Sequence, residues 1–365
     1  MTTRTVLVGL GWSGREIWLP RLLGRDDYDV VAGVDPDPAC RAAFTAATGR
    51  PAFADPGALD TGQADLAVVA VPNHAHAPVA RTLLLRGLAT FVEKPVCLTT
   101  DEAGLLADAE QMGGVPLLAG SAFRYRSDVT ELARLVPALG RVRNVGLSWI
   151  RARGVPQAKG WFTHRALAGG GVLFDLGWHL LDVLDALVGP VTFEQIAAVT
   201  TDDHVNEADR AAAWRHDRPA PEGTADVEDT VRAFMVAGGG LSVGLRASWA
   251  THTATHDVTT VRVEGTAGTA TLRCTFGFSP HREPRSRITH VRAGRVSDIQ
   301  VPAEPVGAEY DRQLSALRTL LAAPSSRGRA IAGAHRIVAA VEAIYAAANT
   351  SLVPAGPAEI KAGER

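Results

Sequence analysis

The chain has 365 residues, of which 46% are hydrophobic and 21% charged, with a formal net charge of −2. This balance carries no polyelectrolyte signal, and the arginines are scattered rather than clustered beside aromatics, which argues against a nucleic-acid groove. Apolar runs fall short of a membrane span, so we expect a protein that does not enter membranes. The cysteines, Cys40, Cys97 and Cys274, are few and far apart, which predicts reduced thiols in the cytoplasm. The length is sufficient for two domains.

The first predicted elements are a strand and a glycine-rich turn. Thr5 to Val8 is a short run of β-favouring residues, and a helix is expected to begin at Arg15. A glycine-rich turn between a strand and a helix lets backbone N–H groups and the helix dipole meet a pyrophosphate. We therefore expect a dinucleotide to bind at this GxGxxG segment, with contacts from Gly9, Gly11, Trp12, Ser13 and Gly14.

A carboxylate follows the second predicted strand, Val30 to Val34. Asp35 lies 35 − 14 = 21 residues after Gly14, a spacing that suits an acid accepting hydrogen bonds from the adenosine ribose hydroxyls. A carboxylate at this point repels a 2′-phosphate, so the sequence favours NAD over NADP. Arg41 lies 41 − 35 = 6 positions further on and keeps NADP open as the alternative.

Short apolar strands alternate with helical segments up to about residue 122. This alternation is typical of βαβ units and predicts a parallel sheet. We therefore assign residues 1–122 to an NAD(P)-binding Rossmann domain. Its further strands are expected at residues 65–71, 90–92 and 115–118, and its further helices at 75–86 and 101–112.

Lys94 stands out by composition and by position. Only three of the 37 basic residues are lysines, which leaves 37 − 3 = 34 arginines. A desolvated lysine can lose its proton and act as an acid or base, whereas arginine stays charged. Lys94 follows a strand that ends at Val92, and strand exits are where open α/β sheets hold ligands. A solvated charge at a strand end is the alternative interpretation.

From about residue 141 the pattern changes to longer, alternating strands. Glycine-rich segments at 238–240 and 265–268 mark hairpins, so this half is expected to form a mainly antiparallel sheet. Residues 201–224 are polar and indicate a surface insertion, and 351–365 a tail. We expect a second, α+β domain at 123–350, with strands at 143–153, 231–236, 241–249, 258–263 and 270–273 and helices at 171–188, 310–321 and 332–348.

The predicted helix at 171–188 carries a polar face. Asp175, His179 and Asp182 follow one another at i, i+4 and i+7, which places them on one side of a regular helix. A carboxylate one turn from an imidazole can fix its tautomer and raise its proton affinity, which suits general acid–base chemistry. An acidic helix start with a satisfied histidine is the alternative. No further ligand stands out, so we expect no metal here.

Taken in order, these motifs resemble one family. The glycine-rich turn, the acid after the second strand, Pro72-Asn73-x-x-His76, Glu93-Lys94-Pro95 and GGGxxx-Asp175-x-Gly177-x-His179-x-x-Asp182 are similar to those of the glucose-fructose oxidoreductase, inositol dehydrogenase and MocA family. The resemblance implies a Rossmann domain joined to an open-faced, mainly antiparallel sheet domain that often mediates homodimers or homotetramers. It also implies catalytic positions at Lys94, Asp175 and His179, and positions near the cofactor at Pro72, Asn73, His76, Glu93 and Lys94.

The resemblance further implies hydride transfer between a nicotinamide and a carbinol or ketone carbon, with one proton handled at the oxygen. We expect His179, oriented by Asp175, to take that proton while Lys94 donates to the same oxygen, although the two roles could be exchanged. The predicted activity is an NAD(P)-dependent dehydrogenase or reductase for a sugar or cyclitol. An NAD-dependent glycosidase that oxidises transiently, and a non-enzymatic sugar or cofactor sensor, are the alternatives.

The substrate pocket is expected to draw on two further segments. Trp161 could stack on a sugar face, and Lys159 could hold hydroxyls or an anionic group. Arg124 is similarly placed at the entry to the second domain. Exposed cations and a core tryptophan are the alternatives. Together with Asp175 and His179, these residues suit a small polyhydroxylated ring.

Overall fold

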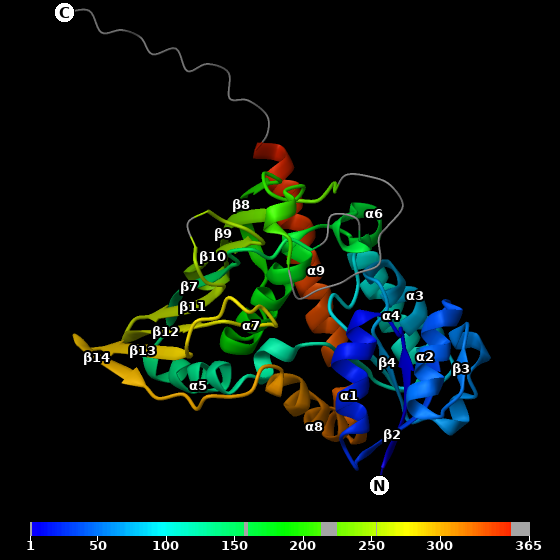
Figure 1. The fold of residues 1–365 in the computed structure, drawn as a ribbon. Coiled ribbons are helices and arrows are strands. Elements are labelled where there is room, and N and C mark those ends of the chain that lie inside the picture. Colours follow the sequence, from blue (N-terminus) through cyan, green and yellow to red (C-terminus); the bar gives the residue numbers. More distant parts are fainter. Residues whose placement is uncertain (1, 157–159, 213–224, 253, 352–365) are drawn as a thin grey trace, which may run out of the picture.

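The computed structural model describes residues 2–156, 160–212, 225–252 and 254–351, and its strands form two sheets (Figure 1). The first is a six-stranded parallel sheet with the order β3-β2-β1-β4-β5-β6. The predicted Rossmann sheet is therefore confirmed. Its strands are β1 (Thr3–Val8), β2 (Tyr28–Val34), β3 (Ala52–Phe53), β4 (Leu66–Val69), β5 (Thr90–Val92) and β6 (Leu117–Ala119).

This first sheet is buried on both faces. In β4, Leu66 and Val68 belong to one apolar cluster, whereas Ala67 and Val69 belong to another. Because successive side chains of a strand point to opposite faces, both sides of the sheet need a cover, which helices supply. These helices are α1 (Leu19–Leu23), α2 (Pro38–Thr48), α3 (Asn73–Leu85) and α4 (Thr100–Gly113).

The second sheet has eight strands in the order β14-β13-β12-β11-β7-β10-β9-β8. Pairing is antiparallel except between β7 and β10, so the mainly antiparallel prediction is confirmed. Gly238–Gly240 joins β9 to β10, and the turn after Gly265 joins β11 to β12, as predicted. The strands are β7 (Val142–Ile150), β8 (Phe193–Thr201), β9 (Thr230–Ala237), β10 (Leu241–Ser248), β11 (Val258–Gly265), β12 (Gly268–Cys274), β13 (Arg287–Arg292) and β14 (Arg295–Ile299).

Helices cover one face of this second sheet. Val145, Leu147 and Trp149 alternate along β7 as buried residues of the core, and α5, α7 and α9 contact strands of the sheet. A π-helical turn, Leu173–Gly177, precedes α7. The helices of this part are α5 (Ser127–Leu135), α6 (Arg165–Ala168), α7 (Trp178–Val188), α8 (Ala308–Ala322) and α9 (Arg329–Ser351).

The last two helices also reach the first sheet. Gln313 of α8 donates to the carbonyl of Ala119 at 3.0 Å. Helix α9 contacts β6 and α4 in addition to β8 and α7. The division that we propose at residue 122 therefore separates the two sheets, while the C-terminal helices pack on both.

No apolar run of the sequence was expected to span a membrane. Among the described residues, however, one helix, Pro324–Asn349, is long and apolar enough to cross a membrane by length and composition. In the structure this helix packs within the protein, against β8, α4, α7 and β6. Core helices pass the same test. Its buried apolar residues are Ile331, Ala334, Ile337, Val338, Ala340, Val341, Ile344 and Ala348.

Candidate active site

The glycine-rich turn lies between β1 and a π-helical turn, Ser13–Trp18. Gly9 has φ +94°, and a Cβ there would lie 2.4 Å from Ala70 O. At Gly14 a Cβ would lie 2.0 Å from Gly9 O, so both positions require glycine. A Cβ at Gly11 would meet nothing within 4 Å. The turn thus packs tightly against the sheet at two glycines and leaves open space at the third, which fits the approach of a pyrophosphate.

Asp35 follows β2 and organises the backbone beside the turn. Its two carboxylate oxygens accept hydrogen bonds from Leu10 N and Asp37 N, both at 2.8 Å. Arg41 donates through Nη1 to the carbonyls of Asp35 and Pro36, each at 2.8 Å. These bonds hold the carboxylate next to the glycine-rich turn and direct the guanidinium toward the backbone.

The segment that begins α3 joins the two domains. Asn73 is buried and donates through Nδ2 to Ala168 O at 2.9 Å. The ring of His76 is buried, with Nδ1 2.6 Å from Pro95 O, and burial lowers its pKa to about 4. Its Nε2 has no hydrogen-bond partner among the described residues. Pro72 precedes the helix with extended dihedral angles, φ −60° and ψ 150°, as its N-cap.

Glu93 and Lys94 follow β5 at the carboxyl edge of the parallel sheet. Glu93 accepts from Trp18 Nε1 at 3.0 Å and from Lys94 N at 2.8 Å, and burial raises the pKa of this carboxyl. The peptide bond between Lys94 and Pro95 is cis. The buried Trp18 and the partly buried Glu93 therefore fix the backbone from which the Lys94 side chain extends.

The glycines that precede the π-helical turn at 173–177 pack closely against neighbouring residues. A Cβ at Gly171 would lie 1.9 Å from Glu228 O, and one at Gly170 would lie 2.0 Å from the hydroxyl oxygen of Tyr345. The buried carboxylate of Glu228 accepts from Gly171 N and Leu173 N at 3.0 Å, and from the Tyr345 hydroxyl at 2.7 Å. This carboxylate satisfies backbone donors at the helix start and anchors the segment that carries Asp175.

Asp175 is the centre of an ion cluster. Lys94 Nζ donates to Asp175 Oδ1 at 2.7 Å, while Oδ2 accepts from Trp249 Nε1 at 2.9 Å and from Arg151 Nη1 at 3.3 Å. The carboxylate is thus engaged by Lys94 from the first domain as well as by the second domain. Its charge also raises the pKa of His179 against the larger effects of burial and Lys94, and the predicted orienting role of Asp175 stays a prediction.

His179 lies on α7 against an aromatic wall. Its ring centroid is 5.8 Å from that of Trp149 and 5.0 Å from that of Phe276. Burial lowers the pKa of His179 well below 6.5, and the nearby charge of Lys94 adds to this effect. Nδ1 has no hydrogen-bond partner among the described residues. The imidazole is consequently neutral at physiological pH.

Asp182 and Arg124 do not belong to this cluster. Asp182 is buried and accepts from Arg124 Nε at 2.9 Å and from Ser121 Oγ at 3.2 Å, in a separate cavity beside α9. Of the three residues predicted to share a face, Asp175 and His179 therefore line one cleft, whereas Asp182 lines another cavity. Arg124 therefore pairs with a buried acid in this separate cavity, and its predicted contact with substrate stays a prediction.

One cleft receives side chains from both domains. Trp161, which packs edge-on against Phe162 with centroids 4.9 Å apart, lines this cleft. Lys159 lies outside the described residues, as do 213–224 of the predicted insertion and 352–365 of the predicted tail. The predicted site residues that line the cleft are Trp12, Ser13, Asn73, His76, Glu93, Lys94, Trp161, Asp175 and His179. The cleft is also lined by residues that were not predicted, which include Ile17, Trp149, Arg151, Phe276, Phe278 and Tyr310.

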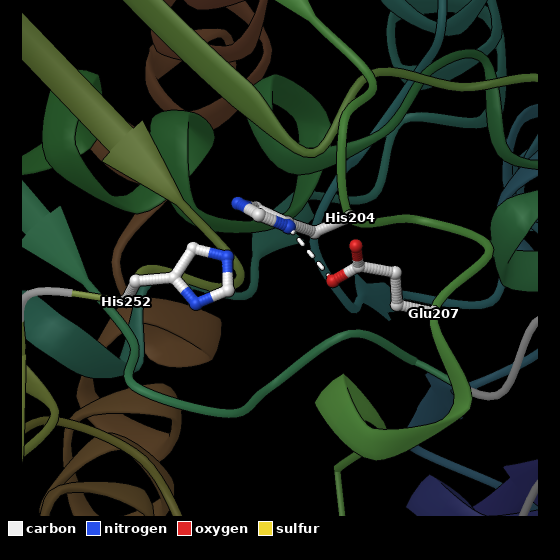
Figure 2. A group of neighbouring side chains, drawn as sticks. All are labelled: His204, Glu207 and His252. Carbon is white, nitrogen blue, oxygen red and sulfur yellow. Dashed lines mark hydrogen bonds and ion pairs between the residues drawn. The ribbon is translucent and has the colours of Figure 1, made fainter.

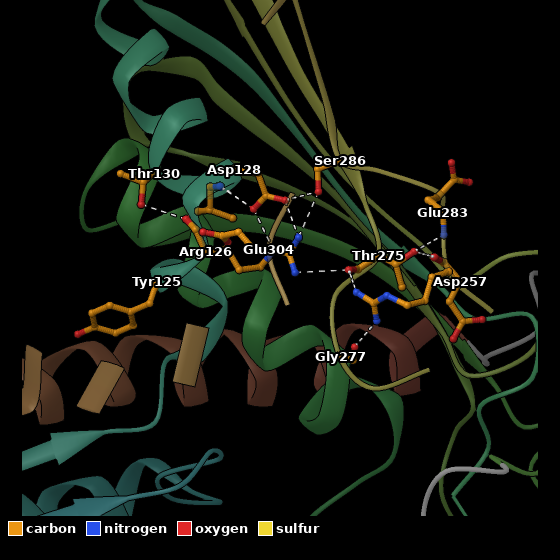
Figure 3. Close-up of polar contacts among 12 residues, drawn as sticks. Tyr125, Arg126, Asp128, Thr130, Asp257, Thr275, Gly277, Glu283, Ser286 and Glu304 are labelled. Atoms are coloured by element: carbon orange, nitrogen blue, oxygen red, sulfur yellow. Dashed lines mark hydrogen bonds and ion pairs between the residues drawn. The ribbon is translucent and has the colours of Figure 1, made fainter. Parts of the chain in front are cut away.

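Gly277 lines the cleft, and two arginines bind carbonyls at or beside it; Figure 3 labels Gly277, Thr275 and one of these arginines, Arg126. Arg282 donates to Gly277 O and, at 2.9 Å, to Thr275 O. Arg126 donates to Thr275 O at 3.4 Å and forms a 2.6 Å ion pair with the buried Asp128. These bonds satisfy carbonyls of an irregular segment and fix the aromatic residues on either side of Gly277.

Outside the cleft, three side chains come together at the connections after β8 and β10 (Figure 2). The ligand atoms of His204, Glu207 and His252 lie within 4.8 Å of one another. His204 Nδ1 is 2.9 Å from Glu207 Oε2. Arg210 is hydrogen bonded to His252, and its Nε is 3.4 Å from Glu207 Oε2. Because a permanent cation already neutralises the carboxylate, we assign no metal to this cluster.

Comparison with known proteins agrees with this geometry. Residues 3–121 match the family "Oxidoreductase family, NAD-binding Rossmann fold", and residues 134–271 match the "GFO/IDH/MocA C-terminal domain". A protein of Amycolatopsis mediterranei, named "Putative UDP-kanosamine synthase oxidoreductase subunit", is 56% identical over 96% of this chain and 97% of its own length. The chain belongs to the Gfo/Idh/MocA family. It is therefore an NAD(P)-dependent oxidoreductase, as predicted.

Two further similarities are informative within this Gfo/Idh/MocA family. The dTDP-3,4-didehydro-2,6-dideoxy-alpha-D-glucose 3-reductase of Streptomyces antibioticus is 30% identical over 47% of this chain and 52% of its own length. The structure of levoglucosan dehydrogenase in complex with NADH and levoglucosan is similar with a TM-score of 0.77. Its sequence is 18% identical, and the match covers 96% of this chain and 98% of that one. The latter likeness supports the fold of both domains.

Proposed function

We propose that this chain is an NAD-dependent oxidoreductase that interconverts a ring hydroxyl and a ketone at C3 of a nucleotide-linked hexose. The observation that carries the proposal is the meeting of Lys94, Asp175 and His179 in one cleft beside the glycine-rich turn. The nucleotide and the ring position are supported by the names of two relatives, one for a UDP-linked amino sugar and one for a dTDP-sugar 3-reductase.

The residues present fit a nicotinamide dinucleotide. Gly11 leaves space for a pyrophosphate, and Asp35 stands beside the turn with a carboxylate that disfavours a 2′-phosphate. Ser13, Asn73, His76 and the other predicted contacts would hold the remainder. When bound, the dinucleotide supplies the two-electron oxidant or reductant. We therefore keep NAD as the preferred cofactor over NADP.

The proton is handled by two groups with different charge states. His179 is neutral because its burial and the charge of Lys94 lower its pKa, so it can accept the proton of a ring hydroxyl. Lys94 forms an ion pair with Asp175 at 2.7 Å, and its amino group is a hydrogen-bond donor. As a donor it stabilises the oxygen as negative charge develops there. We therefore assign the base to His179 and the electrophilic donor to Lys94.

The cleft suits a polyhydroxylated ring. Trp161 and Phe162 offer an aromatic surface at its edge, and Trp149 and Phe276 offer another beside His179. The rings exclude water from the reacting carbon and fit the apolar faces of a pyranose. Asn73 is committed to Ala168 O through its Nδ2, so hydroxyl recognition falls mainly to the charged groups.

We further propose a cytoplasmic homo-oligomer assembled through the uncovered face of the second sheet. Phe234 of β9 and Val199 of β8 are exposed to 54% and 44% on this sheet. Large apolar side chains on a sheet face are typical of an interface. Sedimentation of the purified protein checks the proposal, and a monomer at micromolar concentration would contradict it.

A substrate panel tests the proposed reaction. The protein is incubated with NAD or NADP and with nucleotide sugars, free sugars, sugar phosphates or cyclitols, and reduced nicotinamide is followed by absorbance. We expect accumulation with a nucleotide-linked hexose and NAD. Release of an aglycone without accumulation would indicate the glycosidase alternative. Cofactor binding with no turnover across the panel would instead favour the sensor.

A further inference from the structure

Arg151 follows β7 and enters the cleft opposite Lys94. Its Nη1 donates to Asp175 Oδ2 at 3.3 Å, whereas Lys94 Nζ donates to Oδ1 of the same carboxylate at 2.7 Å. The side chains are 13%, 9% and 16% exposed for Arg151, Asp175 and Lys94. A single buried anion is thus shared by two cations, one from each domain, and the group of three carries a net charge of +1.

The local sequence makes room for this arginine. A Cβ at Gly154 would lie 2.3 Å from Arg151 Cδ and 3.0 Å from Arg151 Cβ. Gly154 therefore lets the stem of Arg151 fold over the backbone, and its carbonyl accepts from Nη1 at 3.4 Å. The guanidinium carbon lies 5.2 Å from the centre of the Trp149 ring, a cation–π distance. These contacts give the guanidinium one defined place in the cleft.

The second oxygen of Asp175 is fixed by two donors from the sheet. Trp249 Nε1 reaches Oδ2 at 2.9 Å, and Arg151 reaches it at 3.3 Å. With Oδ2 held in this way, the carboxylate plane is set and Oδ1 is left to Lys94. We infer that Arg151 is a positioning residue of the catalytic centre, which orients Asp175 toward Lys94 and places a second positive charge near His179.

The charges around His179 support this second effect. The groups that face it are Lys94 from the end of β5, Asp175 from the preceding helical turn and Arg151 from the end of β7, while its ring neighbours Trp149 and Phe276 carry no charge. Burial lowers the pKa of His179 most, Lys94 and Arg151 lower it further, and Asp175 opposes them. Loss of the Arg151 charge therefore raises this pKa, and more of the imidazole is protonated at a given pH.

The kinetic part of the test depends on the proposed function, whereas the titration of His179 does not. Full-length protein labelled with ¹⁵N is titrated by NMR, and the His179 ring is assigned with a His179→Asn variant. Arg151→Gln removes the charge, Arg151→Lys retains it, and Gly154→Ala displaces the arginine by steric overlap. Arg81→Gln, an equal change of charge on the exposed side of α3, is the matched control. Unfolding temperature and NAD affinity verify that each variant is folded.

We expect the titration of His179 to move to higher pH in Arg151→Gln and Gly154→Ala, and to stay near the wild-type position in Arg151→Lys and Arg81→Gln. In the oxidative direction the acid limb of the pH profile of kcat should also move to higher pH in these two variants, because His179 must be neutral to act as the base. The inference is overturned if the pKa of His179 is unchanged in Arg151→Gln or in Gly154→Ala, provided that the variant is folded. A wild-type chain with no turnover on any substrate would refute the proposed function and leave the NMR result to decide about Arg151.

Discussion

His76 makes the folded protein sensitive to acid. Its Nδ1 is 2.6 Å from Pro95 O, so this nitrogen carries the hydrogen, and the buried Nε2 must be protonated to charge the ring. Burial lowers the folded-state pKa to about 4, against 6.5 for an unperturbed histidine. The neutral ring therefore stabilises the fold fully above pH 6.5, and this contribution is lost as the pH falls from 6.5 to 4.

The size of the effect follows from linkage. A difference of 6.5 − 4 = 2.5 pKa units corresponds to about 3 kcal/mol in the free energy of unfolding, of which about 2 kcal/mol is lost between pH 7 and pH 5. Urea unfolding of wild type and His76→Asn at both pH values, without cofactor, measures it. The variant should lose about 2 kcal/mol less than wild type on acidification. Equal losses in the two proteins would refute the buried neutral histidine.

Three further predictions concern the cleft and the glycine-rich turn beside it. Lys94→Met and His179→Asn should each lower kcat by about 10²-fold or more while NAD affinity, measured by calorimetry, is retained; wild-type turnover in either variant would remove that residue from the mechanism. Asp35→Ser should raise kcat/KM with NADP relative to NAD, because a carboxylate repels the 2′-phosphate, and an unchanged ratio of the two constants would contradict the assigned cofactor preference. Gly14→Ala, whose Cβ would lie 2.0 Å from Gly9 O, should lower the free energy of unfolding by about 1–3 kcal/mol, and chemical denaturation that shows an unaltered midpoint would disprove the tight turn.

The parallel sheet could be predicted because its strands carry continuous apolar runs. Strands 30–34 and 90–92 appear at their predicted positions, extended by two residues at the start of the first. Helix α2, Pro38–Thr48, was missed because only Cys40 and Phe44 of it are buried, which leaves a weak apolar period. Strand β8 was missed for a similar reason, since most of its side chains are partly or fully exposed.

The candidate site could be predicted only where motifs are local. Lys94 and His179 meet in one cleft as expected from their separate motifs. The ion pair of Asp175 with Lys94 was not predicted, because sequence spacing shows neighbours along a helix but not a lysine 81 positions away. Arg151 was missed as a site residue for the same reason, although its place at the end of a strand offered a signal.

Isotope transfer tests the central claim most directly. A UDP-hexose carrying deuterium on C3 is incubated with the protein and NAD, and the reduced nicotinamide is analysed by mass spectrometry. The account predicts one deuterium in each reduced nicotinamide and a matching amount of 3-keto sugar, both abolished in Lys94→Met and His179→Asn. Reduced nicotinamide without deuterium, or unaltered transfer by those variants, would contradict it.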